Sequence, residues 1–145
     1  MKVLIVAHPD DEVLWFNPEE FDRIVIVFGD FGDGRSGDGR RKALRRHPLR
    51  DKITHLDLTE SNYWRDKSKK AECGKNADDL RAFLETLEAD EVVTHDANGE
   101  YGHADHIMVH GVCMMTLNCP VNGKDPVLYR RIRKAYLDNG AWTWH

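Results

Sequence analysis

The sequence has no apolar run long enough to cross a lipid bilayer. Its longest apolar runs, Val3–Ala7 and Ile24–Phe28, fall far short of the roughly 20 residues that a membrane-spanning helix needs. The first run leads straight into His8 and acidic residues, with no small-residue cleavage site of the kind that ends a signal peptide. We therefore expect no transmembrane segment, and we interpret the N-terminal run as a buried strand.

Cysteine is also scarce. Cys73, Cys113 and Cys119 are odd in number and lack the CxxC spacing of many redox and metal sites. This pattern predicts free thiols in a reducing compartment, and we expect a cytoplasmic location. We interpret Cys113 and Cys119 as core residues rather than metal ligands.

The sequence lacks a strong excess of charge of either sign. Its net charge of −4 argues against a general nucleic-acid-binding protein. Positive charge is concentrated only between Arg40 and Lys52, which is either a solvated helix face or a contact for an anionic substrate. A hydrophobic fraction of 41% in 145 residues predicts one folded domain over residues 1–145.

Apolar runs alternate with helical patterns along the chain, which is typical of βα units and a mainly parallel sheet. The clearest helical pattern places Leu80, Phe83, Leu84 and Leu87 on one face, with Asn76 as the expected N-cap. The predicted strands are Lys2–Ala7, Asp22–Phe28, Ile53–Leu58, Glu91–His95 and Pro126–Ile132, and the predicted helices are Arg40–Leu49, Ala77–Glu88 and Asp105–Leu117.

These elements predict an α/β fold, a Rossmann-like three-layer sandwich with a mainly parallel sheet of about five strands. In such a doubly wound sheet we expect the first and fourth strands to lie side by side, near the point where the strand order reverses. Ligands bind there, beyond the carboxyl ends of the strands. Because polar clusters follow both of these strands directly, we expect the functional site at this edge of the sheet.

The first polar cluster, His8-Pro9-Asp10-Asp11-Glu12, follows the first predicted strand. Histidine and carboxylate together suit Zn²⁺, and a catalytic zinc typically takes three protein ligands and keeps a position for water. Two adjacent carboxylates allow one to bind the metal while the other removes a proton from the water. The alternative is that Asp10 and Asp11 only cap a helix that begins near Glu12.

The second polar cluster runs from Glu100 to His106 and is followed by His110. A helix would present His106 on one face with either His103 or His110. One histidine can complete a metal site, and another, held by a carboxylate such as Asp105, can stabilise an oxyanion or protonate a leaving amine. His110 lies deeper in the predicted helix, and we interpret it as structural.

A glycine-rich loop after the second predicted strand offers a rival function. The segment Gly32-Asp33-Gly34-Arg35-Ser36-Gly37 fits GxGxxG, and Asp57 follows at a distance suited to a ribose contact in a nucleotide-binding module. However, three aspartates place negative charge where a pyrophosphate would bind, and no apolar helix begins at Gly37. We favour a loop that shapes the rim of a metal site, with Asp30 as a candidate supporting residue.

The segments Ala7-His-Pro-Asp-Asp-Glu12 and Tyr101-Gly-His-Ala-Asp-His106 together resemble the signatures of the PIG-L (LmbE-like) family of zinc-dependent de-N-acetylases. Both occur in the expected order and at the ends of the expected strands, and the resemblance covers roughly residues 1–118. Members of that family act on N-acetylglucosaminyl-phosphatidylinositol, on mycothiol and bacillithiol precursors and on glycopeptide antibiotics. The resemblance implies a hydrolase that removes an acetyl group from an N-acetylglucosamine-like sugar or its conjugate.

The resemblance also implies a role for each signature residue. One Zn²⁺ per chain, or another divalent metal, would be held by His8, Asp11 and His106. Asp10 would be the general base that activates the attacking water. His103, oriented by Asp105, would stabilise the tetrahedral intermediate or act as general acid, with Tyr101 as a candidate helper.

The sequence departs from the family in length and in one motif. The chain is much shorter than is usual, so we expect reduced pocket walls, or a homo-oligomer whose neighbour supplies them through Trp142 and Trp144. The usual Arg…Glu pattern has no match, since no glutamate follows Arg40-Arg41-Lys42. A relative that binds metal but has lost catalysis is therefore a second alternative. The expected partner is a small-molecule or glycoconjugate substrate, with no specific nucleic acid.

Overall fold

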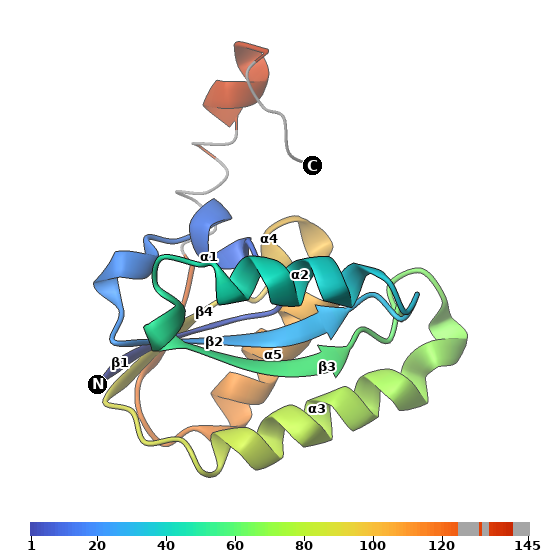
Figure 1. The fold of residues 1–145 in the computed structure, drawn as a ribbon, viewed down its shortest axis with the longest axis horizontal. Helices are drawn as coiled ribbons and strands as arrows, with labels where there is room; N and C mark the ends of the chain where they lie inside the picture. Colours follow the sequence, from blue (N-terminus) through green and yellow to red (C-terminus); the bar gives the residue numbers. More distant parts are fainter. Residues whose placement is uncertain (125–130, 132–133, 141–145) are drawn as a thin grey trace.

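In the described part of the chain, five strands form one parallel sheet, which lies between two layers of helices (Figure 1). The computed structural model describes residues 1–124, 131 and 134–140. Within these residues the strand order is β3-β2-β1-β4-β5, and each neighbouring pair is parallel. The strands are β1 Lys2–Val6, β2 Arg23–Asp30, β3 Ile53–Thr59, β4 Glu91–Thr94 and β5 Val121–Gly123. The α/β three-layer prediction is therefore confirmed.

The helices cover both faces of this sheet. Helix α2 lies on one face, where the short α1 and α4 also lie, and α3 and α5 cover the other (Figure 1). Their bounds are α1 Asp11–Leu14, α2 Ser36–Arg45, α3 Lys70–Leu84, α4 Gly99–Gly102 and α5 Ala104–Thr116. Single 3₁₀ turns occur at Pro18–Glu20, Arg50–Lys52 and Lys67–Lys69. None of the helices in the described ranges is long and apolar enough to span a membrane.

The central strand β1 is buried on both faces, which explains its uninterrupted apolar sequence. Successive side chains of a strand point to opposite faces. Accordingly, Val3 and Ile5 lie in one core cluster with side chains of α3 and α5, whereas Leu4 and Val6 lie in a second cluster with Leu44 of α2. Each fully buried aliphatic side chain contributes about 1.5–3 kcal/mol, so the sheet is a firm platform for the loops beyond its carboxyl edge.

The predicted adjacency of the first and fourth strands is confirmed. β1 pairs with β4 in parallel, from Lys2 opposite Glu91 to Ile5 opposite Thr94, and pairs with β2 on its other side. Because both strands run in the same direction, their carboxyl ends deliver the two polar clusters to one edge of the sheet.

Helix α2 begins four residues before the predicted start at Arg40, at Ser36. The reason is local: one carboxylate oxygen of Asp33 accepts hydrogen bonds from the backbone N–H groups of Arg35 and Ser36, at 2.8 and 2.9 Å. These bonds occupy donors that the first turn of a helix leaves unpaired. They allow a glycine-bearing segment to enter the helix.

The prediction that Asn76 caps its helix is wrong, because α3 begins at Lys70 and contains Asn76. The buried Asn76 side chain instead donates from Nδ2 to the carbonyl oxygen of Thr59, at 2.9 Å. It therefore joins the middle of α3 to the end of β3.

The fifth strand of the sheet, β5, is formed by Val121–Gly123 rather than by the segment predicted from the sequence. The predicted strand Pro126–Ile132 lies, apart from Arg131, outside the described residues, as do Trp142 and Trp144.

Candidate metal centre

The first polar cluster forms a tight turn directly after β1. Asp10 has a left-handed backbone, with φ 95° and ψ −25°, and its N–H donates to Oε2 of Glu12 at 2.9 Å. The Asp11 carboxylate turns back and accepts the N–H of His8 at 2.8 Å. Asp10 makes no capping bond through its side chain, so the alternative that these aspartates only cap a helix is wrong.

The second polar cluster forms the turn between β4 and α5. His103 is the N-cap of α5, and its Nδ1 accepts the backbone N–H of Asp105 at 3.1 Å. His106 lies in the first turn of that helix, where only 1% of its surface is exposed. The beginning of α5 thus holds the histidines of this cluster against the turn that follows β1.

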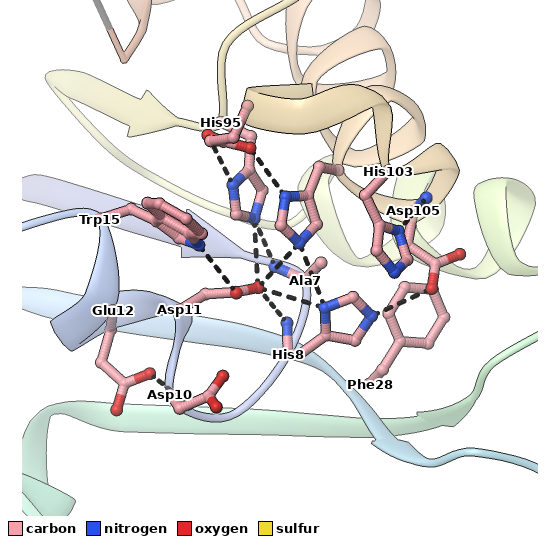
Figure 2. Close-up of polar contacts among 12 residues, drawn as sticks. Ala7, His8, Asp10, Asp11, Glu12, Trp15, Phe28, His95, His103 and Asp105 are labelled. Carbon is pink, nitrogen blue, oxygen red and sulfur yellow. Dashed lines mark hydrogen bonds and ion pairs between the residues drawn. The ribbon is translucent and has the colours of Figure 1, made fainter. Parts of the chain in front are cut away.

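His8, Asp11 and His106 bring three potential ligand atoms together. His8 Nδ1 and Asp11 Oδ2 are 3.3 Å apart, and His106 Nε2 is 3.3 Å from each of them. Figure 2 shows the contacts of His8 and Asp11 within this group. A tetrahedral zinc ion, with ligand distances of about 2.0–2.1 Å, separates its ligand atoms by about 3.3–3.4 Å. The three ligand atoms therefore have the spacing of ligands around a tetrahedral zinc ion.

The second nitrogen of each histidine is held by carboxylates outside the triangle. His8 Nε2 lies 3.0 Å from Asp105 Oδ2 and 3.1 Å from Glu60 Oε1, and His106 Nδ1 lies 2.7 Å from Glu100 Oε2. Since carboxylate oxygens accept, we assign the ring protons to these nitrogens. Both remaining lone pairs then point into the triangle, an arrangement typical of histidine ligands to metals.

The electrostatics of the triangle also favour a cation. Burial lowers the pKa of His8 and of His106, but hydrogen bonds to the surrounding carboxylates outweigh burial and raise both pKa values. Burial raises the pKa of Asp11, but the neighbouring imidazoles of His106, His8 and His95 outweigh burial and hold that pKa well below its usual range. Positive charge is therefore stabilised among these side chains.

His103 stacks on the ring of His106, with 4.7 Å between ring centroids and an interplanar angle of 16°. The sequence predicted that Asp105 orients His103. In the structure the backbone N–H of Asp105 holds His103, whereas the Asp105 carboxylate contacts His8. Because a backbone N–H can only donate, Nδ1 of His103 is an acceptor and Nε2 carries the ring proton. Burial, together with the positive charges of His8 and His106, lowers the pKa of His103 to about 4.

Asp10 differs from Asp11 in its surroundings. Burial and the negative charges of Asp11 and Glu12 raise the pKa of Asp10 to about 6, so its carboxylate is a stronger base than usual. Glu12, which holds the Asp10 backbone, also lies 3.1 Å from His47 Nε2. Two adjacent aspartates thus have opposite pKa shifts, an arrangement that suits a proton acceptor beside a metal ligand.

These side chains open into a cleft of about 1040 Å³. Asp10 and His103 line this cleft, together with the exposed aromatic rings of Phe31, Trp64 and Tyr101. Tyr101, the predicted helper, lies beside both histidines of the second cluster, with its ring centroid 5.8 Å from those of His103 and His106. The predicted reacting groups thus face a common space that is large enough for a substrate.

Sequence reasoning missed four supporting residues. His95 stacks on His106 at 3.8 Å between ring centroids, and the Glu100 carboxylate contacts the Nδ1 atoms of both rings. Glu60 joins His8 to Arg40 of α2, and His47 contacts Glu12. A signal existed for two of them, since His95 and Glu60 directly follow strands that end at the predicted edge. His110 is not in the triangle, and its Nδ1 donates to the His95 carbonyl at 2.7 Å.

The glycine-rich loop after β2 is closed by its own carboxylates. Asp30 Oδ1 accepts the N–H of Gly32 at 2.6 Å, and Asp33 Oδ1 accepts those of Arg35 and Ser36. The donors that would bind a pyrophosphate are therefore already occupied, which argues against a nucleotide-binding module. Asp30 shapes the loop and does not contact the ligand triangle.

The basic segment is divided between two environments. Arg40 pairs with Glu60 at 2.8 Å and lines the cleft, whereas Arg41 pairs with Asp57 at 2.8 Å. Arg45 and Arg46 are exposed, as a solvated helix face would be.

Comparison with known proteins gives concordant results. The PIG-L family, described as GlcNAc-PI de-N-acetylase, matches residues 3–117. A 1D-myo-inositol 2-acetamido-2-deoxy-alpha-D-glucopyranoside deacetylase of Actinosynnema mirum is 26% identical, over 76% of this chain and 52% of its own. This chain therefore spans about half the length of that relative.

A solved structure of similar fold is a deacetylase in complex with bog, from the biosynthesis pathway of teicoplanin. The two folds superpose with a TM-score of 0.59 and 22% identity, over 83% of this chain and 65% of the other. The family match covers most of the chain and includes both polar clusters that meet at the ligand triangle, so this chain belongs to the PIG-L family.

Proposed function

We propose that this chain is a zinc-dependent hydrolase that removes the acetyl group from an N-acetylated amino sugar or its conjugate. The observation that carries the proposal is the triangle of His8, Asp11 and His106, with Asp10 and His103 beside it in one cleft. Membership of the PIG-L family and the similarity to deacetylases support the reaction class.

His8, Asp11 and His106 are the residues that would hold the ion. When bound, zinc would supply a Lewis acid for the amide carbonyl and lower the pKa of the attacking water. Asp10 lies next to the ligand Asp11, lines the cleft and has a pKa raised to about 6. A base with a pKa near the working pH suits this reaction, so Asp10 accepts the proton of the water.

His103 acts as a neutral hydrogen-bond donor. Its Nδ1 is occupied by the backbone N–H of Asp105, so Nε2–H is the group that it offers to the cleft. A fixed donor of this kind stabilises the oxyanion that forms when water attacks an amide. With a pKa lowered to about 4, His103 is not a source of protons near neutral pH. Of its two predicted roles, we therefore favour oxyanion stabilisation.

The cleft favours a conjugate over a free sugar. Its volume of about 1040 Å³ lies at the upper end of the range for small-molecule sites, and one amino sugar would fill only part of it. Trp64, Phe31 and Tyr101 provide apolar surface beyond the reacting groups. The substrate is thus an N-acetylated sugar that carries a further, partly apolar group.

A deacetylation screen tests this function. Purified protein is loaded with one equivalent of zinc and assayed for acetate release from N-acetylglucosamine and a series of its O-glycosides, with chelator-treated protein as the control. We expect zinc-dependent acetate release, faster for glycosides than for the free sugar. Stoichiometric zinc binding without acetate release from any compound would instead support a relative that has lost catalysis.

A further inference from the structure

Glu100 is a buried carboxylate in an unusual backbone conformation, between β4 and α5. Only 8% of the residue is exposed, and its φ of 62° and ψ of −63° lie in a region that residues with a Cβ rarely adopt. It does not line the cleft, so it has no direct access to substrate. Strained backbone of this kind is concentrated at functional sites, so we expect a role for the Glu100 side chain in the metal centre.

Asp96 fixes this conformation from both directions. Asp96 Oδ1 accepts the backbone N–H of Glu100 at 3.1 Å, and Glu100 Oε1 accepts the backbone N–H of Asp96 at 3.3 Å. Asp96 Oδ1 also accepts the N–H of Asn98, at 2.7 Å. The turn is thus built to hold the Glu100 carboxylate in one place.

That carboxylate contacts the Nδ1 atoms of two stacked histidines, whose ring protons can be assigned. The backbone N–H of Ala7 donates to His95 Nε2 at 2.9 Å, so the ring proton of His95 must be on Nδ1 (Figure 2). His95 Nδ1 lies 3.1 Å from Glu100 Oε1, and His106 Nδ1 lies 2.7 Å from Glu100 Oε2. One carboxylate therefore receives two imidazole N–H groups, one on each oxygen.

We propose that Glu100 is a positioning residue for the metal ligand His106, fixing both the ring orientation and the Nδ1–H tautomer that leaves Nε2 free for the ion. This inference rests on the proposed metal-dependent function. His95 takes part as the second support of Glu100, because its own tautomer is fixed by the backbone of Ala7.

An amide at this position cannot replace the carboxylate. In Glu100→Gln, the side chain offers one acceptor and one donor to two Nδ1–H groups, so one histidine faces an N–H group whichever way the amide turns. His95 cannot move its proton to Nε2 without opposing the N–H of Ala7. His106 can, but its proton would then occupy the nitrogen that binds the metal.

The test is a zinc titration of the metal-free protein in competition with a chromophoric chelator, with thermal unfolding of the same metal-free samples. We expect Glu100→Gln to lower zinc affinity by about 10–100-fold while the unfolding temperature of the metal-free protein changes little. The control is His110→Gln, on the helix α5 that carries His106 but outside the ligand triangle, which should bind zinc like the original protein.

A second variant separates the effect of the Glu100 carboxylate from the effect of its strained backbone. Glycine adopts a positive φ readily, so Glu100→Gly relieves the backbone strain and keeps the bond from the backbone N–H of residue 100 to Asp96 Oδ1. It removes the carboxylate, and with it the acceptor of the Asp96 backbone N–H. We expect it to lose zinc affinity by about 10–100-fold as well, because both Nδ1–H groups lose their acceptor. The absorption spectrum of bound Co²⁺ reports whether the ligand geometry has changed in either variant.

Unchanged zinc affinity in both variants would overturn the positioning role. A loss of zinc affinity together with a large drop in the unfolding temperature of the metal-free protein would overturn the positioning role too. Glu100 would then be structural. If the original protein binds no zinc, the proposed function itself fails, and that outcome is distinct from either result.

Discussion

Asp10 adopts a backbone conformation that is costly for any residue with a Cβ, and Glu12 holds it there. Its φ of 95° places the carboxylate in the cleft beside Asp11, and Glu12 fixes the turn by accepting its backbone N–H. The surrounding negative charge that raises the pKa of Asp10 would destabilise an ordinary surface aspartate. At the scale of one residue, both backbone and charge suit the proposed role of Asp10 as a proton acceptor, at a cost in stability.

The first prediction concerns Asp10 as the proposed proton acceptor. Asp10→Asn should lower kcat by about 10²–10⁴-fold, because an amide cannot accept the proton of water, while zinc content stays at the original level. The measurements are steady-state kinetics and metal analysis of the same sample. The comparison variant is His106→Ala, which should lose both metal and activity because it removes a ligand. Full activity of Asp10→Asn would exclude Asp10 from the mechanism.

The second prediction concerns His103. His103→Ala should lower kcat by about 10²–10³-fold, as expected for removal of one oxyanion donor, with zinc content unchanged. A histidine with a pKa lowered to about 4 is protonated only below that pH, so it does not titrate between pH 6 and 9. The pH–rate profiles of the variant and the original protein should therefore be parallel over this range. An alkaline limb that disappears in His103→Ala would show that His103 acts as a charged acid.

At the scale of elements, most helices and strands could be predicted because their signals are local. The apolar runs of β1 and β2 and the leucine face of α3 follow from periodicity alone. The start of α2 could not be predicted, since it depends on how the Asp33 side chain folds back onto two backbone N–H groups. For the same reason, the glycine pattern alone could not exclude a phosphate site.

The third prediction concerns the link between α3 and β3. Asn76→Ala should lower the free energy of unfolding by about 0.5–1.5 kcal/mol, because the part-buried hydrogen bond from Asn76 to the Thr59 carbonyl is lost. Chemical denaturation with urea measures this loss. The control is Asn118→Ala, at an exposed position after α5, which should change stability by less than about 0.5 kcal/mol. Equal effects in the two variants would argue against the link.

At the scale of the whole molecule, the two signatures could be predicted to meet because each follows one of two adjacent parallel strands. Other supporting residues depend on packing between elements that are distant in sequence: His47 follows α2 and contacts Glu12 after β1. Glu100 also escaped prediction, although it lies inside the second cluster, because its role depends on the proton positions of two rings. Cytoplasmic location and homo-oligomer formation stay predictions.

The cleft gives the last prediction, on substrate binding. Trp64 is 39% exposed, and its ring centroid lies 5.4 Å from that of His103. The Arg65 guanidinium lies 4.3 Å from the Trp64 ring centroid and also lines the cleft. Trp64→Ala should raise KM for an aryl or alkyl glycoside of N-acetylglucosamine by about tenfold, or about 1.4 kcal/mol, because the variant loses apolar contact area for the group attached to the sugar.

The free sugar is the internal comparison for this variant, since it lacks the attached group, and its KM should change much less. Trp64→Phe should restore most of the affinity because a flat aromatic ring is retained. Loss of contact in the ground and transition states alike raises KM and leaves kcat unchanged. A fall in kcat with unchanged KM would instead mean that Trp64 acts on the reaction, through the ring of His103, and not on the attached group.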